Sequence, residues 1–295
     1  MKMKKLIVGL SLVMVLLLTG CSGMVRIVRM GNIIQKTFDF TNFTRVEVTD
    51  AMQYEIRQSD TYNINVSLHE NALKYLDIHQ SGETLYVGYR PGFFLANDAS
   101  IIVEMPRLTG LVASGSTKGS LGGFDSTDSL NVTVASASKL ALEITSGLTF
   151  LRVSDSSEVN GTLQAADTTI IVASASKLDM SLKTGKTSIS AKDSSDVAGS
   201  LQSLDLTLKL EGASTCALTG SAGATTIDAS DDSKISSGLK LQSANVKLTG
   251  ASDADIYTDG ALNINVSDAS LLNYGGNPSI GQIDINGGSK VNHVQ

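Results

Sequence analysis

Cysteine, tryptophan and positive charge are scarce in this sequence. The few cysteines exclude an internal disulfide, and the acidic balance argues against nucleic-acid binding. The 295 residues contain two cysteines and no tryptophan. Because the first cysteine lies near the N-terminus and is assigned below to a lipid anchor, Cys216 is left without a partner for an internal disulfide. Acidic residues outnumber basic residues by 29 to 23. This balance argues against nucleic acid as a partner, since proteins that bind nucleic acid carry basic patches.

The hydrophobic run near the N-terminus is too short to span a membrane. Residues 6–18 are largely apolar and follow three lysines, and about thirteen apolar residues cannot cross a bilayer as a helix. A basic start, a short apolar core and small residues before a cut site are typical of a secretory signal. The ending Leu18-Thr19-Gly20-Cys21 resembles the lipobox of bacterial lipoproteins, although an ordinary signal cleaved nearby is an alternative. We predict a signal peptide at 1–20, lipidation of Cys21 and a tether at 21–37.

Small residues, by contrast, are abundant and recur with a regular period. The serines that close small-residue clusters lie at positions 116, 138, 157, 176, 195, 214, 233, 252, 270 and 289. The first interval is 22 residues, the interval from 252 to 270 is 18, and every other interval is 19. A fixed period of this length indicates a stacked repeat architecture.

Apolar residues keep fixed distances from these serines. They occupy the positions six and four residues before each serine, as in Leu151 and Val153, and the position two residues after it, which is filled once by Cys216. Alternation with a period of two indicates short strands with one buried face. We therefore predict an all-β, right-handed parallel β-helix of about ten ~19-residue coils, with a β-sandwich or a large two-sheet roll as the alternatives. Cys216 is expected to be a buried thiol and not a nucleophile.

The position two residues before the serine alternates between two residue classes. From residue 136 onward every second coil carries an aspartate there, at Asp155, Asp193, Asp231 and Asp268. Aspartates that cap a turn or face solvent are the simpler interpretation, and a ladder that binds cations or another ligand is the alternative. Single carboxylates roughly 10 Å apart cannot share one Ca²⁺, so we predict no metal and no cofactor. The alternation also allows 38-residue coils, which would stack the aspartates directly on one another.

The first third of the mature chain is β-like but lacks the 19-residue period. Residues 38–106 form an N-terminal β region or cap, and residues 107–295 carry the repeats. The pattern predicts irregular strands at 46–48, 54–57, 62–68, 75–79, 84–89 and 100–105.

Several segments of this region resemble a known family. The segments Phe43–Val48, Tyr54–Asp60, Gly82–Val87 and Ile102–Ser116, with Gly-Ala-Ser units at 212–214 and 250–252, are similar to the putative auto-transporter adhesin, head GIN domain family. The resemblance covers roughly residues 38–290. It implies a cell-envelope protein with a right-handed β-helical fold, often a bacterial lipoprotein of the Bacteroidetes type. It supplies no catalytic or binding residues.

One motif points instead to an acyl-transferase. Ser136…Lys139 and Ser174…Lys177 match the Ser-x-x-Lys pattern of penicillin-binding proteins, and Lys183-Thr-Gly follows. That chemistry requires the serine at the start of a helix, whereas both copies lie in predicted strand-and-turn units. We therefore interpret the motif as part of the repeat.

Taken together, these patterns favour a lipid-anchored binding module of the cell envelope that is not an enzyme. We expect an adhesin at the outer membrane that contacts glycans or surface proteins, and that can form a homo-oligomer through an open coil end. A β-helical polysaccharide lyase or hydrolase is an alternative, but its carboxylates should be clustered and those here are spread along the repeats. A scaffold or sensor that faces the periplasm is the second alternative.

Overall fold

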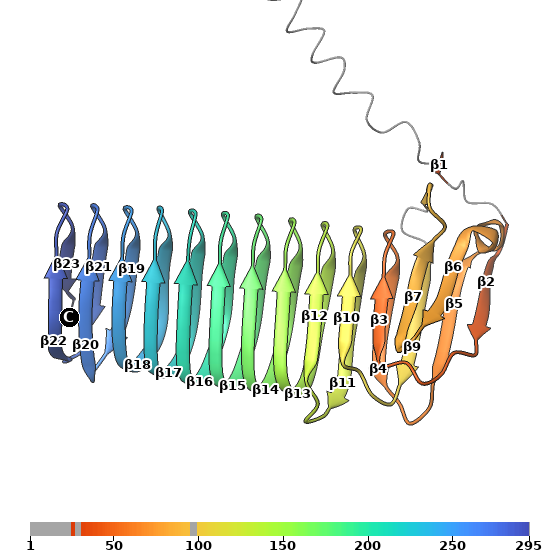
Figure 1. Cartoon of the computed structure of the whole chain (residues 1–295), viewed down its shortest axis with the longest axis horizontal. Helices are drawn as coiled ribbons and strands as arrows, with labels where there is room; N and C mark the ends of the chain where they lie inside the picture. Colours follow the sequence, from red (N-terminus) through yellow and green to blue (C-terminus); the bar gives the residue numbers. More distant parts are fainter. Residues whose placement is uncertain (1–24, 27–30, 95–98, 295) are drawn as a thin grey trace, which may run out of the picture.

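The computed structural model describes residues 25–26, 31–94 and 99–294 and shows a long rod of stacked coils. The predicted parallel β-helix is confirmed (Figure 1). The predicted signal peptide and the predicted lipidation residue, Cys21, lie outside the described residues.

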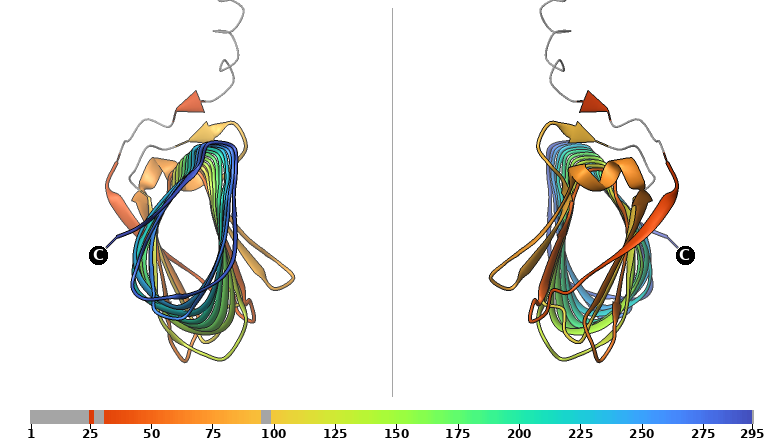
Figure 2. Two further views of the ribbon diagram at one scale, coloured as in Figure 1. Left: turned by 90° about the vertical axis from the view of Figure 1, so that its left-hand side faces the viewer. Right: turned by 90° about the vertical axis from the view of Figure 1, so that its right-hand side faces the viewer.

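Each regular coil consists of one 15-residue strand and a four-residue turn. The strands are β13 (Lys139–Val153), β14 (Glu158–Val172), β15 (Lys177–Ala191), β16 (Asp196–Leu210), β17 (Thr215–Ala229) and β18 (Lys234–Leu248). Successive strands pair in parallel, each shifted by one repeat from the last, as in Lys139 opposite Glu158, so the 38-residue coil is excluded. Pairing skips the residue at the middle of each strand, such as Gly147, where the strand turns a corner. The coil is therefore a flattened oval with a narrow turn at one edge and this corner at the other (Figure 2).

After β18 the two sides of each coil are separate strands. They are β19 (Asp253–Thr258), β20 (Ala261–Val266), β21 (Leu271–Gly275), β22 (Ser279–Ile285) and β23 (Lys290–His293). β20 stacks on β18 and carries β22, while β21 stacks on β19 and carries β23.

The inward columns predicted from the sequence are buried along most of the rod. Leu151, Val153 and Ile170, for example, have no exposed surface. The last coil is the exception, because Ile283 and Ile285 are 53% and 44% exposed although the periodicity predicts them inside. The physical reason is that, among the strands the structure describes, none stacks beyond this coil.

The thiol of Cys216 lies in the inward column, as expected, with 1% of the residue exposed. Burial raises its pKa to about 12, so almost no thiolate is present at neutral pH. We expect Cys216 in the folded chain to resist maleimide labelling at pH 8 and to react fully in denaturant, as read by mass spectrometry. Rapid labelling of the native chain would contradict its burial.

The narrow turn contains two consecutive residues with φ near +60° in every coil. The N–H of the second residue donates to the carbonyl of the first residue in the next coil, at 2.7–2.9 Å. This arrangement corrects the first position of the predicted serine series, Ser116. Ser116 is the second left-handed residue of its turn, and Thr117 takes the place of the repeating serine, since its N–H donates to the hydroxyl of Ser138 at 3.1 Å.

In the middle of the rod, the serine that follows the turn is buried and its hydroxyl makes two hydrogen bonds. Its hydroxyl accepts the N–H of the serine one coil earlier, at 3.1–3.3 Å. The same hydroxyl donates to the carbonyl three residues before it, as in Ser195 to Lys192 at 2.7 Å and Ser214 to Glu211 at 2.8 Å. The serine column therefore satisfies backbone groups, and its hydroxyls do not simply bond one another.

The regular stack begins earlier than the period suggests. β3 (Arg45–Val48) and β4 (Gln53–Gln58) form a coil that pairs with β10 (Gly110–Ala113) and β11 (Lys118–Asp125), and β12 (Leu130–Val134) continues the stack. Arg45 lies opposite Gly110, far along the chain, so this coil does not follow the sequence period. The intervening chain passes outward and then returns across the coil.

That excursion closes the N-terminal end of the rod. β7 (Thr84–Tyr89) and β9 (Ser100–Met105) add one more parallel coil outside β3 and β4. The antiparallel strands β2 (Ile33–Phe38), β5 (Asn63–His69) and β6 (Leu76–Ser81), with a 3₁₀ helix at Glu70–Tyr75, cover this coil. β1 (Val25–Arg26) pairs with β8 (Phe93–Phe94). A single hydrophobic core runs from these strands into the regular coils.

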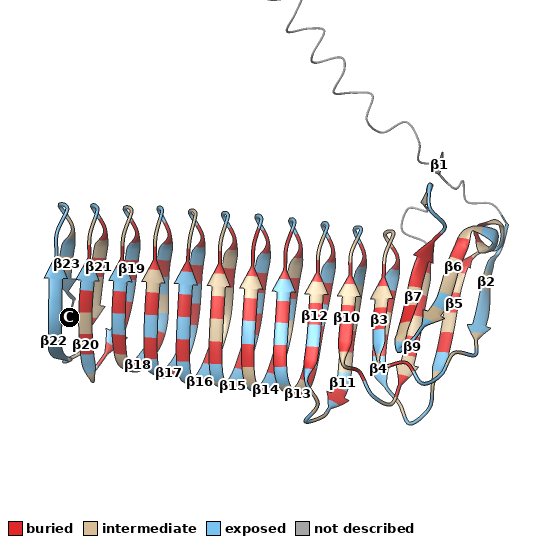
Figure 3. Cartoon of the chain, in the orientation of Figure 1, coloured by how far each residue is buried: buried red, intermediate tan, exposed pale blue. Residues whose placement is uncertain are grey.

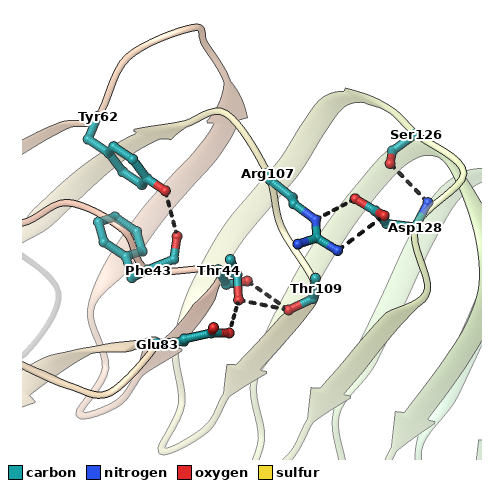
Figure 4. Close-up of polar contacts among 8 residues, drawn as sticks. All are labelled: Phe43, Thr44, Tyr62, Glu83, Arg107, Thr109, Ser126 and Asp128. Atoms are coloured by element: carbon teal, nitrogen blue, oxygen red, sulfur yellow. Dashed lines mark hydrogen bonds and ion pairs between the residues drawn. The ribbon is translucent and has the colours of Figure 1, made fainter.

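Polar contacts hold the segment that returns from β9 to β10 (Figure 4). The hydroxyl of Thr109 donates to the carbonyl of Thr44 at 3.2 Å. Beside it, the hydroxyl of Tyr62 donates to the carbonyl of Phe43 at 3.0 Å and fixes the chain that leads into Thr44. Arg107 makes a two-pronged contact with Asp128, at 2.6 and 3.2 Å. The hydrogen bond from Arg107 holds the pKa of Asp128 below its usual range.

This lowered pKa predicts that the junction loosens in acid. Because the pKa of Asp128 is depressed in the folded state, the contact stabilises the fold above the unfolded-state pKa and is lost as pH falls through the folded-state value. We expect the amides of residues 107–109 to lose hydrogen-exchange protection at that pH, after correction for intrinsic exchange rates. In Arg107→Gln the protection should already be reduced at neutral pH and should change less in acid. If the acid-induced loss of protection were the same in this variant, the contact between Arg107 and Asp128 would not be its cause.

Candidate binding groove

The aspartates predicted as a possible ladder all lie in the narrow turn. Asp155, Asp193, Asp231 and Asp268 are each the first left-handed residue, a conformation that aspartate tolerates better than most residues. The hydroxyl of the preceding serine donates to the carboxylate in three of them, at 2.9 Å for Asp155. Asp50 has the same place in the first coil, which the sequence analysis missed.

Glycines in the intervening coils explain part of the alternation. A Cβ at Gly250 would lie 2.8 Å from the amide nitrogen of Asp231, and one at Gly287 would lie 2.6 Å from that of Asp268. Within the described residues, no group of three or more His, Cys, Asp or Glu side chains could hold a metal ion. Binding of cations by the aspartates stays a prediction, and these residues line none of the hollows described next.

Three adjoining hollows follow the rod along the outer surface of one sheet and its corner. They have volumes of about 670, 420 and 770 Å³, taken from the N-terminal end. Glu143 and Thr162 line both the first and the second hollow, and Lys183 lines both the second and the third. The hollows therefore form one continuous surface, which we call the axial groove.

A column of side chains in strict register forms the centre of the axial groove. Each residue lies opposite the next in the neighbouring coil, in the order Thr145, Gln164, Lys183, Gln202, Ser221, Lys240 and Tyr257. The column is made of hydroxyl, amide, ammonium and phenol groups at successive coil spacings of about 4.8 Å. It can donate and accept hydrogen bonds repeatedly along one direction.

The charge of the axial groove changes along its length. Glu55, Asp125 and Glu143 line the N-terminal half. Arg57 lies among them but donates to Glu55 at 3.1 Å and to Glu104 at 2.8 Å. In the other half, Lys183 and Lys240 are exposed and make no ion pair within the part of the chain that the structure describes. Asp259 also lines this half, where it accepts the N–H of Asn277 at 3.0 Å, so the two lysines outnumber the one carboxylate. The C-terminal half is therefore the part suited to an anionic ligand.

The corner beside the lysines alternates between glycine and larger residues. Gly185 and Gly223 stand in every second coil, with Leu204 and Gln242 at the matching position of the coils between them. Leu204 is 75% exposed. The larger side chains thus form the rim of the axial groove, and the glycines leave gaps between them.

Sequence reasoning did not find this site. Lys183 was noticed only within Lys183-Thr-Gly, and the structure places this motif at the corner of a β-coil, where Thr184 and Thr187 are hydrogen-bonded through their hydroxyls. The signal that could have located it is the seventh residue after each repeating serine, which is polar from coil to coil.

Comparisons with known proteins agree with this architecture. A sequence model of the family described as putative auto-transporter adhesin, head GIN domain, matches residues 42–182 and 170–278. No curated protein matches the chain by sequence.

Several solved structures with this fold come from Parabacteroides and Bacteroides. A putative adhesin from Parabacteroides merdae has 16% identity and a TM-score of 0.60, covering 93% of this chain and 100% of its own. A putative lipid binding protein from Parabacteroides distasonis has 14% identity and a TM-score of 0.60, with coverage of 92% and 100%. A putative adhesin from Bacteroides fragilis has 13% identity and a TM-score of 0.55, with coverage of 92% and 100%.

Proposed function

Because the chain belongs to the head GIN domain family of putative auto-transporter adhesins, we propose that it is a non-catalytic adhesin that binds an extended acidic polysaccharide along the axial groove. The single observation that carries this proposal is the register column with two lysines that make no ion pair among the described residues. Lys183 and Lys240 stand three coils apart, about 14 Å. The hydroxyl and amide groups between them suit the neutral part of a sugar chain, and the ammonium groups suit its carboxylates.

We place the protein at the cell envelope, held by a lipid on Cys21 at the outer membrane. The support is the signal-like N-terminus and the cysteine that ends it, because acyl chains hold a protein on a membrane without spanning it. Among the described residues, no helix is long and apolar enough to cross a membrane.

A binding comparison tests the groove. The probes are polygalacturonate and its methyl-esterified, neutral counterpart. We expect the charged polymer to bind more tightly, and Lys183→Gln/Lys240→Gln to weaken its binding roughly tenfold, since two exposed ion pairs each contribute up to about 1 kcal/mol. Lys192→Gln/Lys234→Gln removes the same charge outside the groove and should leave binding unchanged. Equal binding of both polymers, or equal loss in both variants, would refute the proposal.

Two further experiments separate the alternatives. Protease added to intact cells should digest the rod if it faces outward, whereas protection would favour a scaffold or sensor in the periplasm. Turnover of the polysaccharide that disappears in Asp193→Asn/Asp231→Asn would favour a lyase or hydrolase. We expect binding without turnover in both the natural chain and this variant.

A further inference from the structure

The C-terminal end of the rod is an open face of the core. Among the described strands, β22 and β23 pair only with the coil before them, and every residue of β22 is exposed. Ile283 is 53% exposed, while Ile264, its neighbour one coil earlier, is 1% exposed. Figure 3 shows the same contrast between the last strands and the banded burial of the regular coils. The outer edges of β22 and β23 also leave main-chain groups without a partner strand among the described residues.

The opposite end of the rod shows how such a face is normally closed. There the antiparallel strands and the 3₁₀ helix cover the outermost coil, and Leu68, Ala72 and Leu76 are buried. An unpaired strand edge with exposed apolar side chains is a template for another chain. The C-terminal coil offers both features and no cover within the part of the chain described.

We propose that a second copy of this chain covers the C-terminal coil, end to end about a twofold axis. A twofold contact uses the same surface on both copies and closes without further growth. It would supply each open strand with a partner strand and bury Ile283 and Ile285 against the other copy. The proposal does not depend on the axial groove or on the lipid anchor.

The charges of the last coil select one of two possible arrangements. Asp284 lies on β22 and Lys290 lies on β23, and neither makes an ion pair within the described chain. If β22 met β22 of the second copy, the twofold axis would make the pair antiparallel, so Asp284 near one end of β22 would lie opposite the uncharged start of the partner strand and far from any lysine of that copy. If β22 meets β23 of the second copy, each aspartate faces a lysine, and this crosswise contact occurs twice. Opposite charges across a strand pair stabilise it, and only the crosswise arrangement forms such pairs, so it is favoured.

Other polar groups at this end are already engaged and do not alter the choice. The ring of His293 stacks on Tyr274 with centroids 4.9 Å apart, and its Nε2 lies 2.7 Å from the carbonyl oxygen of Gly276. The side chain of Asn292 donates to that of Asn273 at 3.0 Å. Asp284 accepts only a long hydrogen bond, from the side chain of Asn286 at 3.4 Å. Asp284 and Lys290 are therefore the charges available for a contact across the axis.

Charge exchange tests the arrangement. Sedimentation of the full chain in a non-ionic detergent should show a dimer. Asp284→Lys or Lys290→Asp alone should raise the dimer dissociation constant about tenfold, and the double variant should restore it to within about threefold. Asp179→Lys, at an exposed mid-rod position, is the matched control and should leave it unchanged. A monomeric natural chain, or a double variant as weak as the single ones, would overturn the proposal.

Disulfide capture in membranes gives a second, independent reading. Two differently tagged chains, one Asp284→Cys and the other Lys290→Cys, are mixed and oxidised, with the natural chain as the background for Cys21 and Cys216. We expect a disulfide that joins the two tags and exceeds that formed by either variant alone. A cross-link to a different protein, or no cross-link above background, would refute pairing between two copies.

Discussion

Ser214→Ala should destabilise the rod by about 2–3 kcal/mol, far more than the loss of a typical surface hydroxyl. Ser214 has no exposed surface, and its hydroxyl accepts the N–H of Ser195 at 3.2 Å while donating to the carbonyl of Glu211 at 2.8 Å. Alanine fits the space but has no hydroxyl, so the N–H of Ser195 loses its acceptor and the carbonyl of Glu211 loses its donor. A buried backbone group that loses its hydrogen bond costs about 1–3 kcal/mol, and here two groups lose one each.

The measurement is chemical denaturation together with hydrogen exchange. The amide of Ser195 should lose protection first, because its acceptor lies in the neighbouring coil. Ser200→Ala is the control, since Ser200 lies on the outer surface and its hydroxyl donates only to Ser181, at 2.9 Å. It should change stability by no more than about 0.5 kcal/mol. If the two variants proved equally stable, the serine column would have no structural role.

Gly223→Ala should lower the free energy of unfolding by about 2–4 kcal/mol because its methyl group overlaps the neighbouring backbone. A Cβ at Gly223 would lie 1.9 Å from the carbonyl oxygen of Leu204 in the preceding coil. This oxygen belongs to the backbone, so relief requires the two coils to move apart and to break their ladder at the corner. Forced overpacking and lost backbone hydrogen bonds account for the expected size.

Two controls isolate the cause. Gly122→Ala adds the same methyl group where the nearest atom is 3.7 Å away, and it should be almost neutral. Leu204→Ala alters the same corner at an exposed side chain and should stay within about 0.5 kcal/mol. A thermal midpoint for Gly223→Ala equal to that of Gly122→Ala would show that the corner adapts freely.

The coils could be predicted from the sequence because each regular coil contacts the one that follows it directly along the chain. Leu151 and Ile170 share a column, and the spacing alone places both inside. The coil at β3 and β4 could not be found in this way, since Arg45 pairs with Gly110 and a long excursion of the chain separates them. The exposure of Ile283 could not be predicted either, because the sequence period does not show which coil is left uncovered.

The axial groove was missed for a different reason. Periodicity detects positions that must all be apolar, whereas outward positions such as Gln164 and Lys183 share only their polarity. The hollow itself arises from how the corner is built, with Gly223 beside Leu204 and Gln242. The hollow is lined by residues of several coils, so it forms only when the coils are stacked.

The alternation at the turn and at the corner sets the unit in which the rod can change length. Gly147, Gly185 and Gly223 recur in every second coil, as do Asp155, Asp193 and Asp231. Deleting one coil would bring two aspartate turns, or two glycine corners, into contact. Deleting two adjacent coils keeps each aspartate turn beside a turn without aspartate and each glycine corner beside a larger residue. The rod can therefore be shortened or extended by pairs of coils with this alternation intact, whereas a single-coil change brings two like turns together.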